Sequence, residues 1–194
     1  MSLRIIGGSL KNRTLKAPKG PLSRPTLAIM RKAVFDICQG SIEDADFLDL
    51  FACSGAMGIE AISRGAATAT FIEKDRLSIQ CLQENLKALQ IQSQAHIFCG
   101  DVFSQIKRLS SLNRAFHIVY IDPPYPLAHD PKKPLIPLLH ELDESSLLLP
   151  NATVFLEEGF PGVIPVETLA FTKLRFKNTR KFSQSLLHQF QRIG

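Results

Sequence analysis

The stretch "FLDLFACSGAMGIEAISRGA", residues 47–66, decides the fold. Its first five residues form a short apolar run that is typical of a buried strand. The segment 58–66 predicts a helix with Gly65 as its C-cap. Between them, "FACSGAMG" (51–58) has the spacing of a dinucleotide-binding loop in which Cys53 replaces the first glycine. Strand, glycine loop and helix in this order predict the start of a βαβ unit.

Alternating periodicity continues on the C-terminal side of this stretch. Further strands are expected at 68–73, 95–101, 117–122 and 152–158. Amphipathic helices are expected at 77–89, 103–109 and 135–142. The segment "FTKLRFKNTRKFSQSLLHQF" (171–190) lacks helical spacing and predicts two strands joined by a basic turn. The pattern indicates an α/β fold with a mostly parallel sheet, closed at one edge by an antiparallel C-terminal hairpin.

The first 46 residues have a different character. "LRIIGGSLKNRTLKAP" (3–18) predicts a small β-ribbon with a turn at Gly7-Gly8. A helix is expected from Thr26 onward, with Met30 and Val34 on its apolar face. We therefore expect a single domain, 1–194, with a small basic N-terminal appendage (1–46) on an α/β core (47–194).

Composition restricts the classes of function. The 194 residues are 45% hydrophobic and contain no apolar run near the roughly 20 residues that a membrane span needs. The N-terminus lacks the apolar stretch of a signal peptide, so a cytoplasmic protein is expected. Four separated cysteines and five isolated histidines show no metal-ligand spacing, and we expect no metal.

The net charge of +5 is segregated along the chain. Residues 1–32 hold eight Lys or Arg and no acid, and residues 168–194 hold six and no acid. Residues 33–167 carry a net charge of −9. Clustered bases are attracted by phosphates, so this distribution favours a nucleic-acid partner over a general solubility feature.

Acidic residues follow several predicted strands. Asp49, Glu73, Asp101 and Asp122 lie at or near the carboxyl ends, where open parallel sheets bind ligands. Glu73 suits the ribose hydroxyls of NAD or of S-adenosylmethionine. Asp49 beside the glycine loop suits an ammonium group and Asp101 an adenine amine, which favours S-adenosylmethionine. The alternative for Asp49 and Asp101 is a role as turn or helix-cap residues.

The sequence "HIVYIDPPYP" (117–126) ends a predicted buried strand with an unusual turn. Pro123 and Pro124 have no N–H and cannot continue a strand ladder, so they leave carbonyl oxygens pointing outward. Together with the carboxylate of Asp122, these oxygens can hold both hydrogens of a planar amine and aim its nitrogen at a sulfonium methyl. Tyr125 offers a face on which an unpaired or flipped base can stack.

These residues resemble the D/N-P-P-Y/F amino-methyltransferases, which methylate adenine N6, cytosine N4 or guanine N2. Six blocks, spread over nearly the whole chain, are similar to the bacterial 16S rRNA guanine-N2 methyltransferases of the RsmD type. The blocks are "LRIIGG" (3–8), "RPT" (24–26), "DLFACSGAMGIEAISRGA" (49–66), "FIEKD" (71–75), "YIDPPY" (120–125) and "RKFSQSLL" (180–187).

The resemblance implies a Rossmann-like class I S-adenosylmethionine-dependent methyltransferase fold with a seven-stranded sheet. It also implies that the enzyme methylates N2 of one guanine of 16S rRNA, in the small ribosomal subunit or its assembly intermediate. We further expect the protein to be a monomer. The residues implied for the methionine end of the cofactor are Asp49, Phe51, Ser54, Gly55 and Gly58. Those implied for its ribose and adenine are Glu73, Asp101 and Val102. Those implied to hold the guanine are Asp122, Pro123, Pro124 and Tyr125, and those implied to meet rRNA are Arg4, Arg24, Thr26 and Arg31.

The chain departs from the family pattern at three positions. Cys53 and Ser183 stand where glycine is usual, and Lys32 stands where an acid is common. Three other readings remain open: an adenine-N6 methyltransferase on DNA or another RNA, a nonenzymatic RNA-binding assembly factor, and a nicotinamide oxidoreductase. The last gives Asp-Pro-Pro-Tyr no purpose. The pair Glu157-Glu158 is expected to be a solvated strand end.

Overall fold

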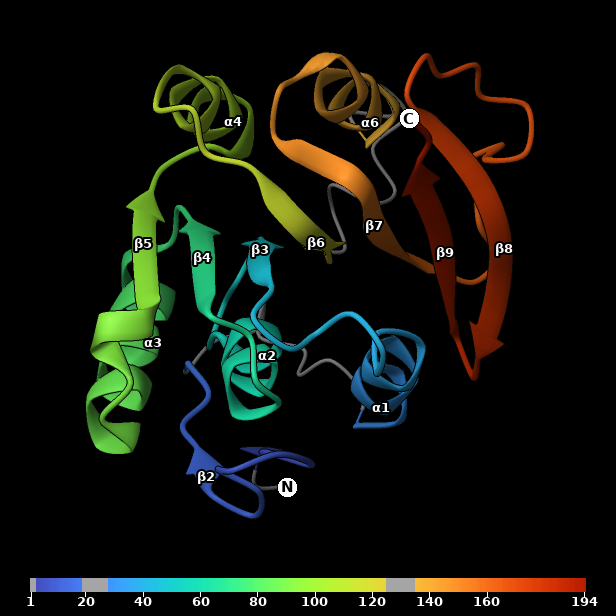
Figure 1. The fold of residues 1–194 in the computed structure, drawn as a ribbon. Coiled ribbons are helices and arrows are strands. Elements are labelled where there is room, and N and C mark those ends of the chain that lie inside the picture. The colour runs from blue at the N-terminus through green and yellow to red at the C-terminus, as the bar shows by residue number, and fades with distance from the viewer. Residues whose placement is uncertain (1–2, 19–27, 125–134) are drawn as a thin grey trace.

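A computed structural model describes residues 3–18, 28–124 and 135–194. Its centre is a seven-stranded sheet with the strand order β5-β4-β3-β6-β7-β9-β8 (Figure 1). The strands of the sheet are β3 (Asp46–Leu50), β4 (Thr68–Glu73), β5 (Ala95–Cys99), β6 (Phe116–Ile121), β7 (Leu148–Gly159), β8 (Leu174–Phe182) and β9 (Ser185–Arg192). The helices are α1 (Ala28–Ile37), α2 (Ala56–Ser63), α3 (Arg76–Leu89), α4 (Val102–Ser111) and α6 (Leu135–Glu144), with a 3₁₀ turn, η1, at Gln92–Gln94.

Strand pairing confirms the predicted α/β sheet. The strands β3, β4, β5, β6 and β7 pair in parallel, whereas β9 pairs antiparallel with both β7 and β8. The order reverses direction between β3 and β6, which is the switch point where open α/β sheets bind ligands. The glycine loop (51–58) follows β3, and the Asp-Pro-Pro segment (122–124) follows the adjacent strand β6.

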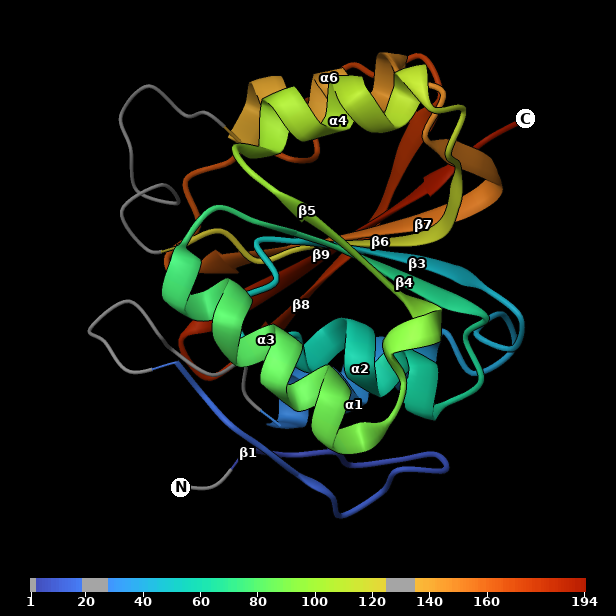
Figure 2. The same ribbon diagram turned by 90° about the vertical axis from the view of Figure 1, so that its left-hand side faces the viewer.

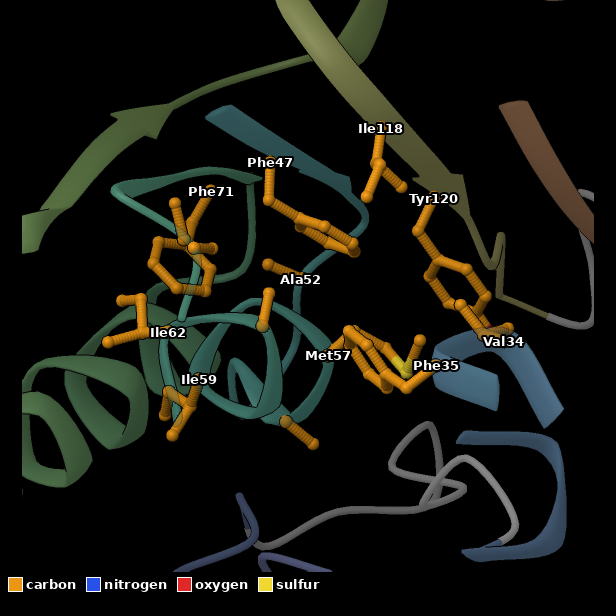
Figure 3. Close-up of a cluster of buried hydrophobic side chains, with 14 of the residues drawn as sticks. Val34, Phe35, Phe47, Ala52, Met57, Ile59, Ile62, Phe71, Ile118 and Tyr120 are labelled. Atoms are coloured by element: carbon orange, nitrogen blue, oxygen red, sulfur yellow. The ribbon is translucent and has the colours of Figure 1, made fainter. Parts of the chain in front are cut away.

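Helices cover both faces of the sheet (Figure 2). The first three helices lie on one face, and α4 and α6 lie on the other. Strand alternation separates the two cores, because successive side chains point to opposite faces. The register partners Phe71, Tyr120 and Phe155 belong to the cluster that includes α1 and α2, which Figure 3 shows in part. Leu48 and Val119 belong to the opposite cluster with α4 and α6.

The N-terminal ribbon lies along α2. Strands β1 (Leu3–Arg4) and β2 (Thr14–Leu15) pair antiparallel, as expected. The predicted position of the turn was wrong, because the chain reverses at residues 9–12 and not at Gly7-Gly8. The two glycines instead lie against the C-terminal end of α2, where Ser63 Oγ donates to the Gly7 carbonyl at 2.6 Å and the Ser9 N–H donates to the Ser63 carbonyl at 2.7 Å.

The C-terminal hairpin is confirmed, but its turn is not basic. The strands β8 and β9 are joined by Ser183 and Gln184, and Ser183 has φ 53°. The bases that suggested a basic turn lie within β8. They are exposed along the last strand of the sheet, whereas Phe176 of the same strand packs against the core cluster that includes α6.

Candidate functional site

The loop after β3 has an unusual backbone. Phe51, Cys53 and Gly55 have φ of 66°, 51° and 80°, so every second residue is left-handed. Only glycine adopts this region without strain, and other residues lose roughly 1–2 kcal/mol there. The Gly55 N–H donates to the Ala52 carbonyl at 2.7 Å, which closes a tight turn before α2. The family resemblance puts glycine at position 53, and the structure shows that Cys53 keeps the glycine-type conformation.

Glu73 fixes this loop to the end of β4. Its Oε2 accepts a hydrogen bond from the Cys53 N–H at 2.8 Å. Its Oε1 accepts from the N–H groups of Lys74 and Asp75, both at 2.8 Å. Each carboxylate oxygen has more than one acceptor direction, so the half-buried side chain retains acceptor capacity beside the loop. The expected role toward ribose hydroxyls stays a prediction.

Asp49 lies beneath the loop and is only 2% exposed. Its Oδ2 accepts a hydrogen bond from the Gly58 N–H at 3.1 Å, which satisfies an amide in the first turn of α2. Burial raises the pKa of the Asp49 carboxyl to about 7, against the opposing hydrogen bond from Gly58. Asp49 is thus a residue of β3 that binds an amide of α2, whose N-cap is Gly55. Its contact with the cofactor ammonium stays a prediction.

Gly58 lets α2 pack closely against the sheet. A Cβ atom at this position would lie 2.3 Å from the Phe71 ring. The helix begins at Ala56, two residues earlier than predicted, and ends at Ser63, with Gly65 one residue beyond the C-cap. This close packing brings the N-terminus of α2 up to the carboxyl end of β3.

Asp101 and Val102 begin α4 after β5. The Asp101 side chain accepts from the Phe103 N–H at 3.0 Å and is the N-cap of the helix. Val102 is buried, and Asp101 is exposed at the same edge of the sheet as the loop. The cap alternative thus holds for Asp101, and adenine recognition by Asp101 and Val102 stays a prediction.

Asp122 follows β6, which lies next to β3. The Asp122 side chain is half-buried. Burial raises the pKa of the Tyr120 phenol, and the nearby charges of Glu157, Asp122 and Asp49 raise it further. Tyr120 donates to Glu157 Oε2 at 2.7 Å. Pro123 is buried and Pro124 half-buried, whereas Tyr125 lies outside the described residues.

The predicted RNA contacts separate into three groups. Arg4 is exposed on β1, and Arg24 and Thr26 lie outside the described residues. Arg31 is only 2% exposed, and its Nη2 donates to the Arg4 carbonyl at 2.8 Å, which joins α1 to the ribbon. A guanidinium buried in this way cannot reach RNA phosphates, so the expectation for Arg31 is corrected.

Two buried polar residues were missed or misread in the sequence. Asn85 on α3 is buried and donates to the Ser54 carbonyl in the loop at 3.0 Å. Glu158 is 1% exposed and lies 3.0 Å from His188 Nε2, so the expected solvated strand end was wrong. Neither has a strong sequence signal, because a lone polar residue on an amphipathic element usually faces solvent.

Comparisons with known proteins place the chain in a family. The family described as "Conserved hypothetical protein 95" matches residues 3–188. Ribosomal RNA small subunit methyltransferase D of Escherichia coli K12 is 34% identical over 164 residues, which cover 84% of this chain and 78% of that protein. The protein of the same name from Haemophilus influenzae is 31% identical over 158 residues, which cover 80% of this chain and 78% of that protein. The chain belongs to the ribosomal RNA small subunit methyltransferase D family. The predicted family is thereby confirmed.

Solved structures confirm the fold of this methyltransferase. A protein of Thermus thermophilus has a TM-score of 0.78 and 28% identity, covering 96% of this chain and 97% of that one. An RNA methyltransferase of Salinibacter ruber in complex with S-adenosyl-L-homocysteine has a TM-score of 0.61 at 14% identity, covering 88% and 94%, and shares the fold alone. The Rossmann-like class I fold is confirmed, and the family is one of methyltransferases, consistent with S-adenosylmethionine as the predicted cofactor.

Two kinds of feature do not occur in the part of the chain that the structure describes. Within residues 3–18, 28–124 and 135–194, none of the helices has the length and apolarity to cross a membrane. The same residues hold no group of three or more His, Cys, Asp or Glu arranged to bind a metal ion.

Proposed function

We propose that this chain transfers the methyl group of S-adenosylmethionine to the exocyclic N2 amine of one guanine in 16S rRNA. One observation carries the proposal: Asp122, Pro123 and Pro124 follow β6 directly, and β6 is the sheet neighbour of β3, which carries the cofactor loop. An amine held at the end of β6 would face a sulfonium held at the end of β3.

The residues at the end of β6 would prepare the amine for attack. The N2 nitrogen is a poor nucleophile, because its lone pair is conjugated with the guanine ring. Acceptors from Asp122 and the Asp-Pro-Pro carbonyls would hold its two hydrogens, which shifts electron density to the nitrogen and fixes its direction. The nitrogen then forms the N–C bond while the C–S bond breaks, leaving S-adenosylhomocysteine, and the surplus proton of the nitrogen leaves through Asp122 to water.

The C-terminal hairpin supplies bases at the same edge of the sheet. Ile121 pairs with Leu156, so Asp122 aligns with Glu157, whose register partners are Leu187 on β9 and then Arg180 on β8. Three strand spacings of roughly 4.8 Å separate Asp122 from Arg180, about 14 Å in all. A nucleotide or two of RNA spans that distance, so exposed bases at this end of β8 can hold phosphates while the guanine enters the site.

The whole small ribosomal subunit or its assembly intermediate is the proposed substrate. Exposed lysines and arginines lie along the short N-terminal ribbon and along β8, and the described residues form no separate domain that could read a nucleotide sequence. Such an interface suits a partner that presents its own folded shape. The adenine-N6 alternative would use the same Asp-Pro-Pro chemistry on a different base.

Methyl transfer to unmodified small subunits tests the proposal. Labelled S-adenosylmethionine is incubated with the enzyme and particles, and the rRNA is digested and its nucleosides identified by mass. N2-methylguanosine at one site is the expected product. N6-methyladenosine would overturn the choice of base, and the absence of any product from particles and from free 16S rRNA would overturn the reaction.

A further inference from the structure

Asn85 joins three segments that lie far apart in the sequence. It is 2% exposed on α3, and its Oδ1 accepts from the Lys16 N–H at 2.8 Å. Its Nδ2 donates to the Lys16 carbonyl at 2.9 Å and to the Ser54 carbonyl at 3.0 Å. One side-chain amide thus bridges the end of the N-terminal ribbon, α3 and the cofactor loop, with both of its polar atoms satisfied.

The bond to Ser54 acts next to a left-handed residue of the loop. Ser54 lies between Cys53 and Gly55, which both have left-handed backbones. The Cys53 N–H is held by Glu73 from one side, and the Ser54 carbonyl is held by Asn85 from the other. Neighbouring backbone groups are therefore fixed by side chains from β4 and α3, which stabilises a conformation that is costly in isolation.

The Asn85 amide also holds the ribbon, through both backbone groups of Lys16. Lys16 follows β2, and its N–H and C=O both bond to Asn85 in the manner of a strand partner. Any shift of the loop that moves Asn85 must also break or stretch these bonds. A ligand that orders the loop would therefore also favour the order of the ribbon, through the bonds that Asn85 makes to both.

We infer that Asn85 is a positioning residue that sets the geometry of the cofactor loop and couples cofactor binding to the order of the N-terminal ribbon. The inference rests on cofactor binding by this loop, which the proposed function also uses. Without the Asn85 amide, the loop and the ribbon would each lose a buried hydrogen-bond partner. The loop would then be less ordered in the free protein. Cofactor binding would have to order it, which lowers the affinity.

Hydrogen exchange on the unaltered protein gives the first test. S-adenosylhomocysteine at saturation is expected to slow exchange of the Lys16 amide, although Lys16 lies on the ribbon. Protection confined to the loop would overturn the coupling. If the unaltered protein does not bind S-adenosylhomocysteine at all, the proposed function fails; binding without protection of Lys16 overturns this inference alone.

Variants at Asn85 give the second test. Asn85→Asp keeps the acceptor for the Lys16 N–H but replaces the donor to the two carbonyls, and Asn85→Ala removes both. We expect S-adenosylhomocysteine to bind at least about 10-fold more weakly, the KM for S-adenosylmethionine to rise with kcat little changed, and ligand protection of Lys16 to be lost at saturation. Glu84→Gln is the matched control, because it neutralises the exposed partner of the Lys16 ammonium, 2.8 Å away, and leaves every hydrogen bond of Asn85 in place. Equal affinities for the Asp variant and the control would overturn the assignment.

Discussion

The buried carboxyl of Asp49 accepts a hydrogen bond from the Gly58 N–H at 3.1 Å, nine residues further along the chain. Burial raises the pKa of this carboxyl to about 7 in the folded protein, from an ordinary value of 3.8. The folded state therefore binds the proton more tightly than the unfolded state. The stabilising contribution is complete below about pH 4 and is lost as the pH rises through about 7.

Asp49→Asn is expected to flatten the pH dependence of stability. The fall in the free energy of unfolding between pH 4 and 7 that is due to Asp49 amounts to at most roughly 4 kcal/mol. Asparagine keeps an acceptor for Gly58 and does not titrate. Urea unfolding of both proteins across this range measures the difference. The same pH slope in the variant would contradict a raised pKa at Asp49.

Cofactor affinity is expected to rise with pH around neutrality. An ammonium group beside Asp49 favours the carboxylate, so binding should release a proton where the carboxyl is still protonated. Titration calorimetry of S-adenosylhomocysteine in buffers of different ionisation enthalpy measures that release. Asp49→Asn should bind more weakly and without the pH dependence. If binding takes up a proton, or exchanges none at about pH 6, the predicted contact between the cofactor ammonium and Asp49 is wrong.

Asp122→Ala is expected to abolish methyl transfer and leave the cofactor in place. The side chain would hold the amine, so kcat should fall by at least about 100-fold, as for other lost electrostatic contacts to a reacting group. The Kd for S-adenosylhomocysteine should change by less than about 2-fold. The Asp122→Asn variant keeps one acceptor oxygen, so its kcat should lie between those of the unaltered protein and the Ala variant. A normal kcat in the Ala variant would remove Asp122 from the mechanism.

The two ends of β8 offer a matched test of RNA contact. Neutralising Arg180 and Lys181, at the end near Asp122, should weaken binding to the small subunit. The slope of log affinity against log salt should fall by roughly 1.4–1.8, since each lost phosphate contact contributes about 0.7–0.9. Neutralising Arg175 and Lys177, at the far end of the same strand, is the control. Equal losses from both pairs would point to a general charge effect.

Glu158→Ala is expected to destabilise the protein strongly. Its carboxylate accepts from the N–H groups of Val163 and Ile164 at 2.6 and 3.0 Å and bonds to the buried His188. Loss of these contacts should cost about 3 kcal/mol, or roughly 6–12 °C in Tm for a protein of this size. Thermal unfolding measures it, with the exposed Glu167→Gln as control. A Tm within about 2 °C of the control would show that the network contributes little.

The sequence predicted the parts of the fold that local pattern determines. Strand 68–73 matches β4 at both ends, because a β-branched run is bounded by a glycine turn and an N-cap aspartate. The helix predicted at 135–142 ends two residues before the observed α6, because Asp143 and Glu144 extend the helix without adding to its apolar face. The turn of the C-terminal hairpin was misplaced because clustered bases were taken for a loop, although they lie on an exposed strand edge.

The site was harder to predict, because it depends on contacts between distant segments. Asp49 and Asp101 have the positions expected of ligand-binding acids. Asp101 is also the N-cap of α4, and Asp49 also accepts from an amide in the first turn of α2. Arg31 belongs to a basic segment, and only tertiary packing shows that its guanidinium is buried against the ribbon. Asn85 has no local signal at all, because its partners lie 31 and 69 residues away.

The exposed bases of β8 have a second consequence, for association between copies of the protein. β8 is the last strand of the sheet, so one row of its backbone N–H and C=O groups faces away from β9. A long open edge of this kind can template pairing with another chain, and charged side chains are a common protection against it. The same bases that would hold rRNA phosphates would then keep two free enzyme molecules from joining their sheets. Replacing these bases would then promote self-association of the enzyme as well as weaken its contact with RNA.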